Sequence, residues 1–150
     1  QNFVPESDED NNRLSLPEPM IIEGVVPTPL PDLTITQGSF NPNPISPGEQ
    51  LTLNVTVRND GPAPSVATRM QVVAIGAPGS GEHLGFVPVQ ASLAPPELLV
   101  LPTATLTIPN DLAPGTYTVR LQVDGQNFVP ESDEDNNRLS LPDLLTIVTP

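Results

Sequence analysis

The acidic run near the C-terminus holds the side chains best suited to bind a metal ion. It reads Glu131-Ser132-Asp133-Glu134-Asp135-Asn136-Asn137. Carboxylate and amide oxygens are the ligands that Ca²⁺ prefers, and the spacing of Asp133, Asp135 and Asn137 matches the first half of an EF-hand loop. Arg138 stands where that motif needs a glycine, and Leu144 stands where it needs a bidentate glutamate. The run is therefore not an EF-hand.

A looser calcium site remains open as an alternative. Its ligands would be drawn from Asp124, Glu131, Asp133, Asp135 and Asn137. The acids of an earlier copy of the run could contribute in place of Asp124; these are Glu6, Asp8 and Asp10. The simpler interpretation, which we favour, needs no cofactor. In it Asn136 and Asn137 bind turn backbone and the acids are solvated, because Asn and Asp side chains commonly close turns.

The other side chains that could do chemistry do not form a catalytic pattern. His83 is the single histidine of a chain without cysteine, so it cannot supply the three or four protein ligands of a zinc site. Ser80 lies in a Gly-Ser-Gly segment, and neither it nor Ser92 lies in a nucleophile-elbow motif. We therefore expect that the protein is not an enzyme.

One N-glycosylation sequon is present, Asn54-Val55-Thr56. Asn54 is predicted to point outward from a strand, which would leave room for a glycan. Rows of outward threonines in the predicted strands could carry O-linked sugars. The alternative, which we favour, is that threonine occurs there for its β-propensity.

The charge balance excludes several classes of partner. Asp and Glu number 18 against 5 basic residues, which gives a formal net charge of −13. Such a surface repels phosphate backbones and anionic lipid, so neither nucleic-acid binding nor membrane insertion is expected. No apolar run approaches the roughly 18 residues of a membrane-spanning helix. Solubility is the simplest reason for the acidity.

The pattern of residues predicts an all-β fold. The 21 prolines and 10 glycines interrupt every stretch that could form an ordinary helix. Apolar residues alternate with Thr, Asn and Arg in runs separated by turn residues, which is typical of half-buried strands. We expect strands near 33–36, 51–57, 66–75, 86–93, 104–108, 117–123 and 139–148. Seven such strands predict an immunoglobulin-like (fibronectin III-like) β-sandwich.

Several residues within these strands have a specific expected role. Pro88 interrupts the weak strand near 86–93, which marks that strand as an edge, and the glycine-rich stretch 76–85 before it is expected to be a loop. Met70, with Val72 and Ala74, is predicted to face inward. Tyr117 begins the sixth strand, where its hydroxyl can return to an upstream carbonyl as in the tyrosine corner of these sandwiches.

A verbatim repeat defines the domain organisation. Residues 1–17 and 126–142 both read QNFVPESDEDNNRLSLP, at an offset of 125 residues, which is the size of one sandwich domain and a linker. The proline-rich stretch 27–31 is predicted to be a stiff linker. The domain is then 32–150, and 1–26 is an extra strand segment equivalent to the end of a preceding repeat.

Four segments together resemble the CARDB family, the cell-adhesion-related domain found in bacteria. They are PDLTIT at 31–36, SPGEQLTLNVTVRNDGPAPS at 46–65, LAPGTYTVRLQVD at 112–124 and ESDEDNN at 131–137. The resemblance implies an extracellular, seven-stranded domain, often repeated in tandem in surface proteins, with adhesive or spacing roles and no known catalysis. The chain departs from the family pattern at 76–102, which is longer and richer in proline and glycine.

Segment 1–26 suggests how copies could assemble. By itself it has no core against which to bury its apolar residues, and free strand edges recruit partner strands. We expect it to be the final strand of a preceding domain in a tandem chain, or a strand donated between subunits. Either contact repeats head to tail and builds an extracellular filament or adhesin of the cell surface from copies of the chain. The predicted assembly strand comprises Phe3, Val4, Leu14, Leu16, Met20, Ile21 and Ile22.

An accessory module that binds carbohydrate or a surface is the alternative function. Sugar-binding platforms usually need exposed aromatic rings, and this chain has only four Phe and one Tyr. We therefore favour the structural module.

Overall fold

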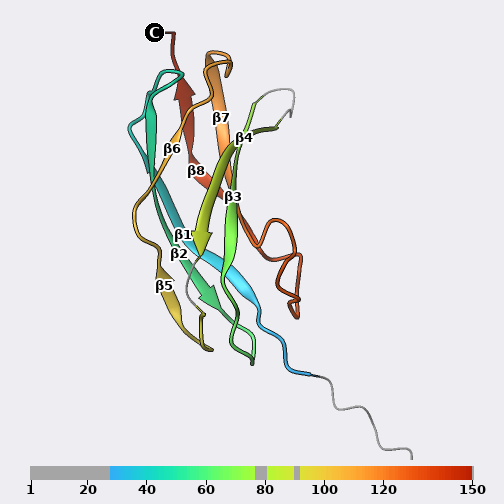
Figure 1. Ribbon diagram of the computed structural model, residues 1–150. Helices are drawn as coiled ribbons and strands as arrows, with labels where there is room; N and C mark the ends of the chain where they lie inside the picture. The colour runs from blue at the N-terminus through green and yellow to red at the C-terminus, as the bar shows by residue number, and fades with distance from the viewer. Residues whose placement is uncertain (1–27, 77–80, 90–91, 150) are drawn as a thin grey trace, which may run out of the picture.

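The computed structural model describes residues 28–76, 81–89 and 92–149, and these residues form strands without a helix. The predicted assembly strand, 1–26, and Ser80 lie outside the described residues. The strands are β1 (Leu33–Asn41), β2 (Gln50–Asn59), β3 (Thr68–Ile75), β4 (Gly81–Val89), β5 (Leu98–Val100), β6 (Ala104–Thr107), β7 (Gly115–Val123) and β8 (Arg138–Ile147), shown in Figure 1. No described segment is a helix long and apolar enough to cross a membrane.

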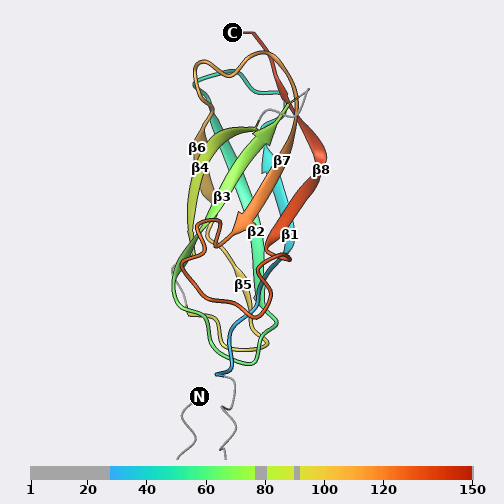
Figure 2. The ribbon, with the colours of Figure 1, turned by 90° about the vertical axis from the view of Figure 1, so that its right-hand side faces the viewer.

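Two antiparallel sheets pack face to face as a sandwich (Figures 1 and 2). The first sheet contains β1 and β2, with β5 and β6 both paired to the other side of β2. The second sheet has the order β4-β3-β7-β8. β6 pairs with residues 50–53 and β5 pairs with residues 56–58, so these two short strands lie one after the other along the same side of β2. The predicted all-β immunoglobulin-like sandwich is confirmed.

Alternation along the long strands builds the core. In β2, Leu51 and Leu53 are buried while the polar residues between them are not, because successive side chains of a strand point to opposite faces. The inward direction predicted for Met70, Val72 and Ala74 is confirmed, since all three are fully buried. The largest fully buried side chains are Leu33, Ile45, Leu51, Leu53, Met70, Leu93, Ile108, Leu121 and Leu145.

The region of β4 and β5 differs from the sequence prediction. Pro88 does lie in an edge strand, but β4 begins at Gly81, so the predicted loop 76–85 was wrong for its second half. Glu82 and His83 are exposed there, which removes the alternation that would have indicated a strand. β5 was not predicted, because it has three residues and Leu98 and Val100 are 58% and 71% exposed.

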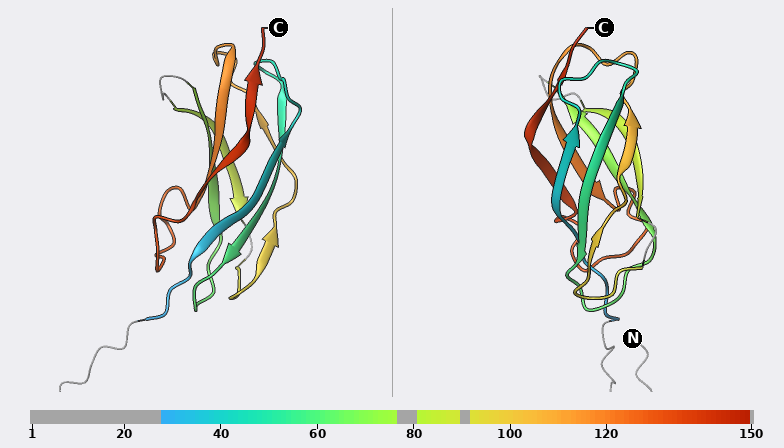
Figure 3. Two further views of the ribbon diagram at one scale, coloured as in Figure 1. Left: turned by 180° about the vertical axis from the view of Figure 1, so that it is seen from behind. Right: turned by 90° about the vertical axis from the view of Figure 1, so that its left-hand side faces the viewer.

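The chain enters and leaves the sandwich at opposite ends. In Figure 1 the described chain enters at the lower end through residues 28–32, in blue, and β8 runs to the upper end. Both views in Figure 3 show the same arrangement. Units joined through these ends would therefore extend along one line.

The tyrosine corner is present. The Tyr117 hydroxyl donates a hydrogen bond to the carbonyl oxygen of Ala113 at 2.7 Å, as the sequence predicted. This bond ties the start of β7 to the turn before it.

We expect Tyr117→Phe to lower the free energy of unfolding by about 1 kcal/mol, the usual net contribution of one hydrogen bond. Chemical denaturation followed by circular dichroism would measure the change. Thr116→Val is the control, since it removes an exposed hydroxyl from the same strand. A Tyr117→Phe protein as stable as the parent would show that the corner bond contributes nothing.

Candidate functional site

The loop between β7 and β8 packs against the segment through which the chain enters the domain (Figure 2). The Ser132 amide donates to the Pro31 carbonyl oxygen at 2.9 Å, and the Leu33 amide donates to the Glu131 carboxylate. The Asn136 side chain donates to the Asp32 carboxylate at 2.8 Å. The repeated acidic run therefore holds the entry segment of its own domain.

The turn after β2 holds the same segment from another direction. The Asp32 amide donates to Asn59 Oδ1 at 3.0 Å, and the Asp60 amide donates to the Asp32 carbonyl oxygen at 2.7 Å. A Cβ on Gly61 would lie 2.5 Å from the Asp32 nitrogen, so only glycine fits there without moving the backbone. We call these two sets of contacts, from Asn59–Gly61 and from Glu131–Asn136, the entry clamp.

Asn59 is the buried centre of the entry clamp. Its side chain is fully buried, and Oδ1 accepts hydrogen bonds from the amides of Asp32 and Gly61. Its Nδ2 donates to the carbonyl oxygens of Ala63 and Leu93, at 2.8 and 2.9 Å. One side chain thus links the entry segment, its own turn and the segment before β5, and all of its hydrogen-bonding capacity is used.

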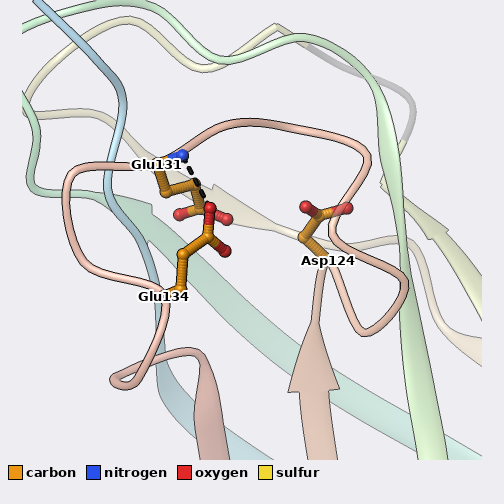
Figure 4. Close-up of side chains that lie close together, drawn as sticks. All are labelled: Asp124, Glu131 and Glu134. Carbon is orange, nitrogen blue, oxygen red and sulfur yellow. Dashed lines mark hydrogen bonds between the residues drawn. The ribbon is translucent and has the colours of Figure 1, made fainter.

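Three carboxyl groups converge beside the entry clamp. Figure 4 shows Asp124, Glu131 and Glu134, and one carboxylate oxygen from each lies within 4.8 Å of the others. Asp124 is fully buried and Glu131 is 7% exposed. Among the described residues the ion pair found is Arg58–Asp60, at 2.6 Å, so no basic side chain neutralises the cluster there. We call Asp124, Glu131 and Glu134 the carboxylate cluster.

Backbone donors position each member of the carboxylate cluster. Asp124 accepts hydrogen bonds from the amides of Phe128 and Val129, at 3.2 and 2.9 Å, and from the Thr68 hydroxyl. It directly follows β7 and has a φ of 46°, a left-handed conformation that Asp tolerates better than most residues. Glu134 accepts from the Glu131 amide at 2.9 Å, the bond drawn in Figure 4.

The environment of Glu131 favours its neutral form. Burial raises the pKa of the Glu131 carboxyl to about 7, although hydrogen bonds from Leu33 and Asn137 act in the opposite direction. The negative charges of Glu134 and Asp124 raise it further. The Asn137 amide that donates to Glu131, at 2.9 Å, is itself 1% exposed.

Two buried oxygens at the cluster have no hydrogen-bond partner. They are Glu134 Oε2 and Asn137 Oδ1. Buried polar atoms are nearly always paired, so each unpaired oxygen needs an explanation. Both atoms are acceptors, which a cation or a proton donor would satisfy.

The structure selects among the calcium ligands proposed from sequence. It brings Asp124 and Glu131 together and places Asn137 against Glu131. Asp133 and Asp135 are exposed, and the Asp135 amide donates to the Asp133 carboxylate at 2.9 Å, as in a turn. The alternative ligands Glu6, Asp8 and Asp10 lie outside the described residues.

Sequence reasoning missed Glu134. The residues at 133, 135 and 137 were chosen by their alternation, but they lie in an irregular loop with bends at 132 and 134–136, where Asn137 is buried while Asp133 and Asp135 are exposed. The favoured interpretation of the asparagines was also wrong, because Asn136 and Asn137 donate to carboxylates and not to turn backbone. The spacing of Glu131 and Glu134, three residues apart across a turn, was the feature of the sequence that could have identified Glu134 as a member of the cluster.

The remaining candidate residues lie elsewhere. Asn54 is exposed on β2, as predicted, and accepts a hydrogen bond from the Thr103 hydroxyl at 3.2 Å. The exposed His83 ring lies 4.5 Å from the ring of Phe86, measured between centroids. The Ser92 hydroxyl donates to the Ser65 carbonyl oxygen at 2.6 Å.

Comparisons with known proteins identify relatives of the domain. The CARDB family model matches residues 30–141. A CARDB domain from Pyrococcus furiosus, solved in complex with di-metal ions, is 26% identical with a TM-score of 0.54 over 79% of this chain and 90% of that chain. No curated protein matches the chain significantly.

Two further solved structures support the fold alone. A domain from Methanosarcina acetivorans, of a protein provisionally named a cell surface protein, is 24% identical with a TM-score of 0.54 over 79% of this chain and 93% of that chain. A β-glucosidase from Erythrobacter marinus is 19% identical with a TM-score of 0.52, over 79% of this chain but 16% of that chain. The sandwich thus also resembles a small part of a much larger enzyme.

Proposed function

The chain belongs to the CARDB family, and we propose that it is a non-catalytic structural module of an extracellular surface protein, joined in series with copies of itself. One observation carries the proposal. The seventeen residues 126–142, which form the loop before β8 and the start of β8, occur a second time at 1–17, ahead of the linker 27–31 of a domain whose ends lie at opposite poles. A surface location is supported by the name of the Methanosarcina relative.

The second copy indicates what the first copy would do in a preceding domain. In the second copy, and in the strand that continues it, the buried apolar residues are Val129, Leu141, Leu145 and Ile147. At the same offset of 125, the first copy and the residues that follow it have Val4, Leu16, Met20 and Ile22. Phe3 is different, because its equivalent Phe128 is 61% exposed. The first copy therefore has the apolar pattern of a final strand.

Tandem repetition accounts for these features better than strand donation. The final-strand position of this domain is filled by its own residues, 138–147. Ile45 also pairs with the end of β8, through the bonds Ile45 N to Thr146 O and Val148 N to Ile45 O, both 3.0 Å. A donated strand would have to displace these contacts, whereas a preceding domain in the same chain would need only its own final strand.

A two-domain protein tests the serial arrangement. The test protein joins residues 28–142 directly to residues 18–150 and so contains two complete domains. Because 126–142 and 1–17 are identical, the sequence across the junction is the natural one. Small-angle X-ray scattering and light scattering should show a monomer whose maximum dimension grows by about one domain length over the single chain. A compact particle with the domains side by side would contradict the proposal.

The single chain distinguishes the two assembly routes. In the tandem arrangement the single chain stays monomeric over a wide concentration range in size-exclusion chromatography with light scattering. Concentration-dependent polymers would instead favour strand donation through 1–26. Met20→Asp with Ile22→Asp is the matched variant, since it would dissolve donated-strand polymers but, in the two-domain protein, would destabilise the first domain only.

A further inference from the structure

The carboxylate cluster brings three acidic side chains together without an ion pair to a basic side chain among the described residues. Asp124, Glu131 and Glu134 each place one carboxylate oxygen within 4.8 Å of the others, and no ion pair with a basic residue reaches them in the described part of the chain. Buried like charges at such distances disfavour one another strongly. Something positive, a proton or a cation, is required to hold them together.

Asn137 supplies the second, independent observation. Its side chain is 1% exposed, it touches the cluster through Glu131 Oε1, and its Oδ1 has no partner. In the structure Nδ2 faces the cluster, and a half-turn of the amide would place Oδ1 there in exchange for the hydrogen bond that Nδ2 donates to Glu131. A proton shared between carboxyl groups would pair Glu134 Oε2 but leave Asn137 Oδ1 without a partner, whereas one cation can take both oxygens as ligands.

We propose that Asp124, Glu131, Glu134 and the amide oxygen of Asn137 bind one Ca²⁺ ion. All four donors are oxygens, which excludes the nitrogen and sulfur sets typical of zinc. Irregular loops suit Ca²⁺ better than Mg²⁺, because Ca²⁺ accepts six to eight ligands in flexible geometry while Mg²⁺ demands a regular octahedron. Water would complete the coordination.

The site would control the direction in which the chain enters the domain. Glu131 also accepts from the Leu33 amide, and the adjacent Ser132 amide donates to Pro31. A cation held by Glu131 and Glu134 therefore stiffens the loop that grips the entry segment. The site itself does not depend on serial assembly, because all four side chains belong to one domain.

Calcium titration of the full chain tests the site. After treatment with EDTA, calorimetric titration with CaCl₂ should detect one site with a Kd of about 10⁻⁴ to 10⁻³ M, the range of extracellular modules. The thermal unfolding midpoint should rise with CaCl₂, and neither NaCl at equal ionic strength nor MgCl₂ should reproduce the rise. Glu134→Gln should weaken binding by about tenfold or more, because ligand charge sets the affinity of such sites.

Three matched variants control for general charge. Asp133→Asn and Asp135→Asn remove one negative charge from exposed positions of the same loop. Glu9→Gln makes the Glu134 substitution in the first copy, away from Asp124, Glu131 and Asn137 in sequence. All three should bind Ca²⁺ like the parent. If the controls lost as much Ca²⁺ affinity as Glu134→Gln, the effect would come from the general negative charge of the chain, and the proposed site would be wrong.

Amide chemical shifts provide a readout that does not rely on a folded variant. Ca²⁺ should shift the backbone amides of Leu33, Glu131 and Ser132 in the parent chain, and leave those of β4 unchanged. Absence of any Ca²⁺-dependent shift at millimolar concentration would overturn the proposal, as would shifts confined to residues 1–17. Serial assembly would be unaffected by either outcome, since scattering from the two-domain protein tests it separately.

Discussion

Asn59→Ala is expected to lower the free energy of unfolding by about 3 kcal/mol or more, because each buried group left without its partner costs about 1 to 3 kcal/mol. The side chain is fully buried and makes four hydrogen bonds to backbone groups. Alanine would leave the amides of Asp32 and Gly61 and the carbonyl of Ala63 unpaired, whereas the Leu93 carbonyl would keep its hydrogen bond from the Ser65 amide. Urea denaturation, followed by circular dichroism, would measure the loss.

Two variants isolate the origin of this effect. Asn54→Ala removes an exposed asparagine from the same strand and should cost less than about 0.5 kcal/mol. Asn59→Asp keeps the shape and the acceptor but removes the two donated bonds and adds a buried charge, so it should destabilise strongly. If Asn59→Ala were as mild as Asn54→Ala, the entry clamp would not contribute to stability.

The metal-free domain is expected to lose stability as the pH rises from 5 to 8. The pKa of Glu131 is about 7 in the folded state against 4.5 in the unfolded chain, so the folded domain binds more protons than the unfolded chain between these values. Stability therefore falls with rising pH in that window and is fully retained only below the unfolded pKa. We expect a loss of about 2 kcal/mol. The full difference between the two pKa values would give more, but solvent screens part of the charge.

Chemical denaturation in EDTA at several pH values would measure this slope. Glu131→Gln is the control, since glutamine can accept the hydrogen bond from the Leu33 amide but does not titrate. Its stability should be nearly flat over the same range. Asp60 does not interfere, because the hydrogen bond from Arg58 holds its pKa below the usual value, so its contribution changes only in more acidic solution. Equal slopes for parent and Glu131→Gln would exclude Glu131 as the cause.

Strands with a strong local signal were predictable from sequence. The alternation in β2 and β7 identified which residues face the core, and Pro88 identified an edge strand, because both depend on the period of a strand and the chemistry of proline. The tyrosine corner followed from the position of Tyr117 at the start of its strand. β5 was not predictable, since its three residues pair with a part of β2 that is distant in sequence. The first half of β4 was not predictable because Glu82 and His83 are both exposed, which removes the alternation.

The sequence by itself determined the class of fold, the family and the existence of a repeat, because periodicity, turn chemistry and a verbatim duplication are local or directly legible. Only the tertiary structure decided that Glu134, and not Asp133 or Asp135, joins Asp124 and Glu131, and that the acidic run grips the entry segment. The contacts between the acidic run and the entry segment join residues about a hundred positions apart, such as Leu33 and Glu131. Their geometry follows from how the bent loop packs against the entry segment, which no local pattern records.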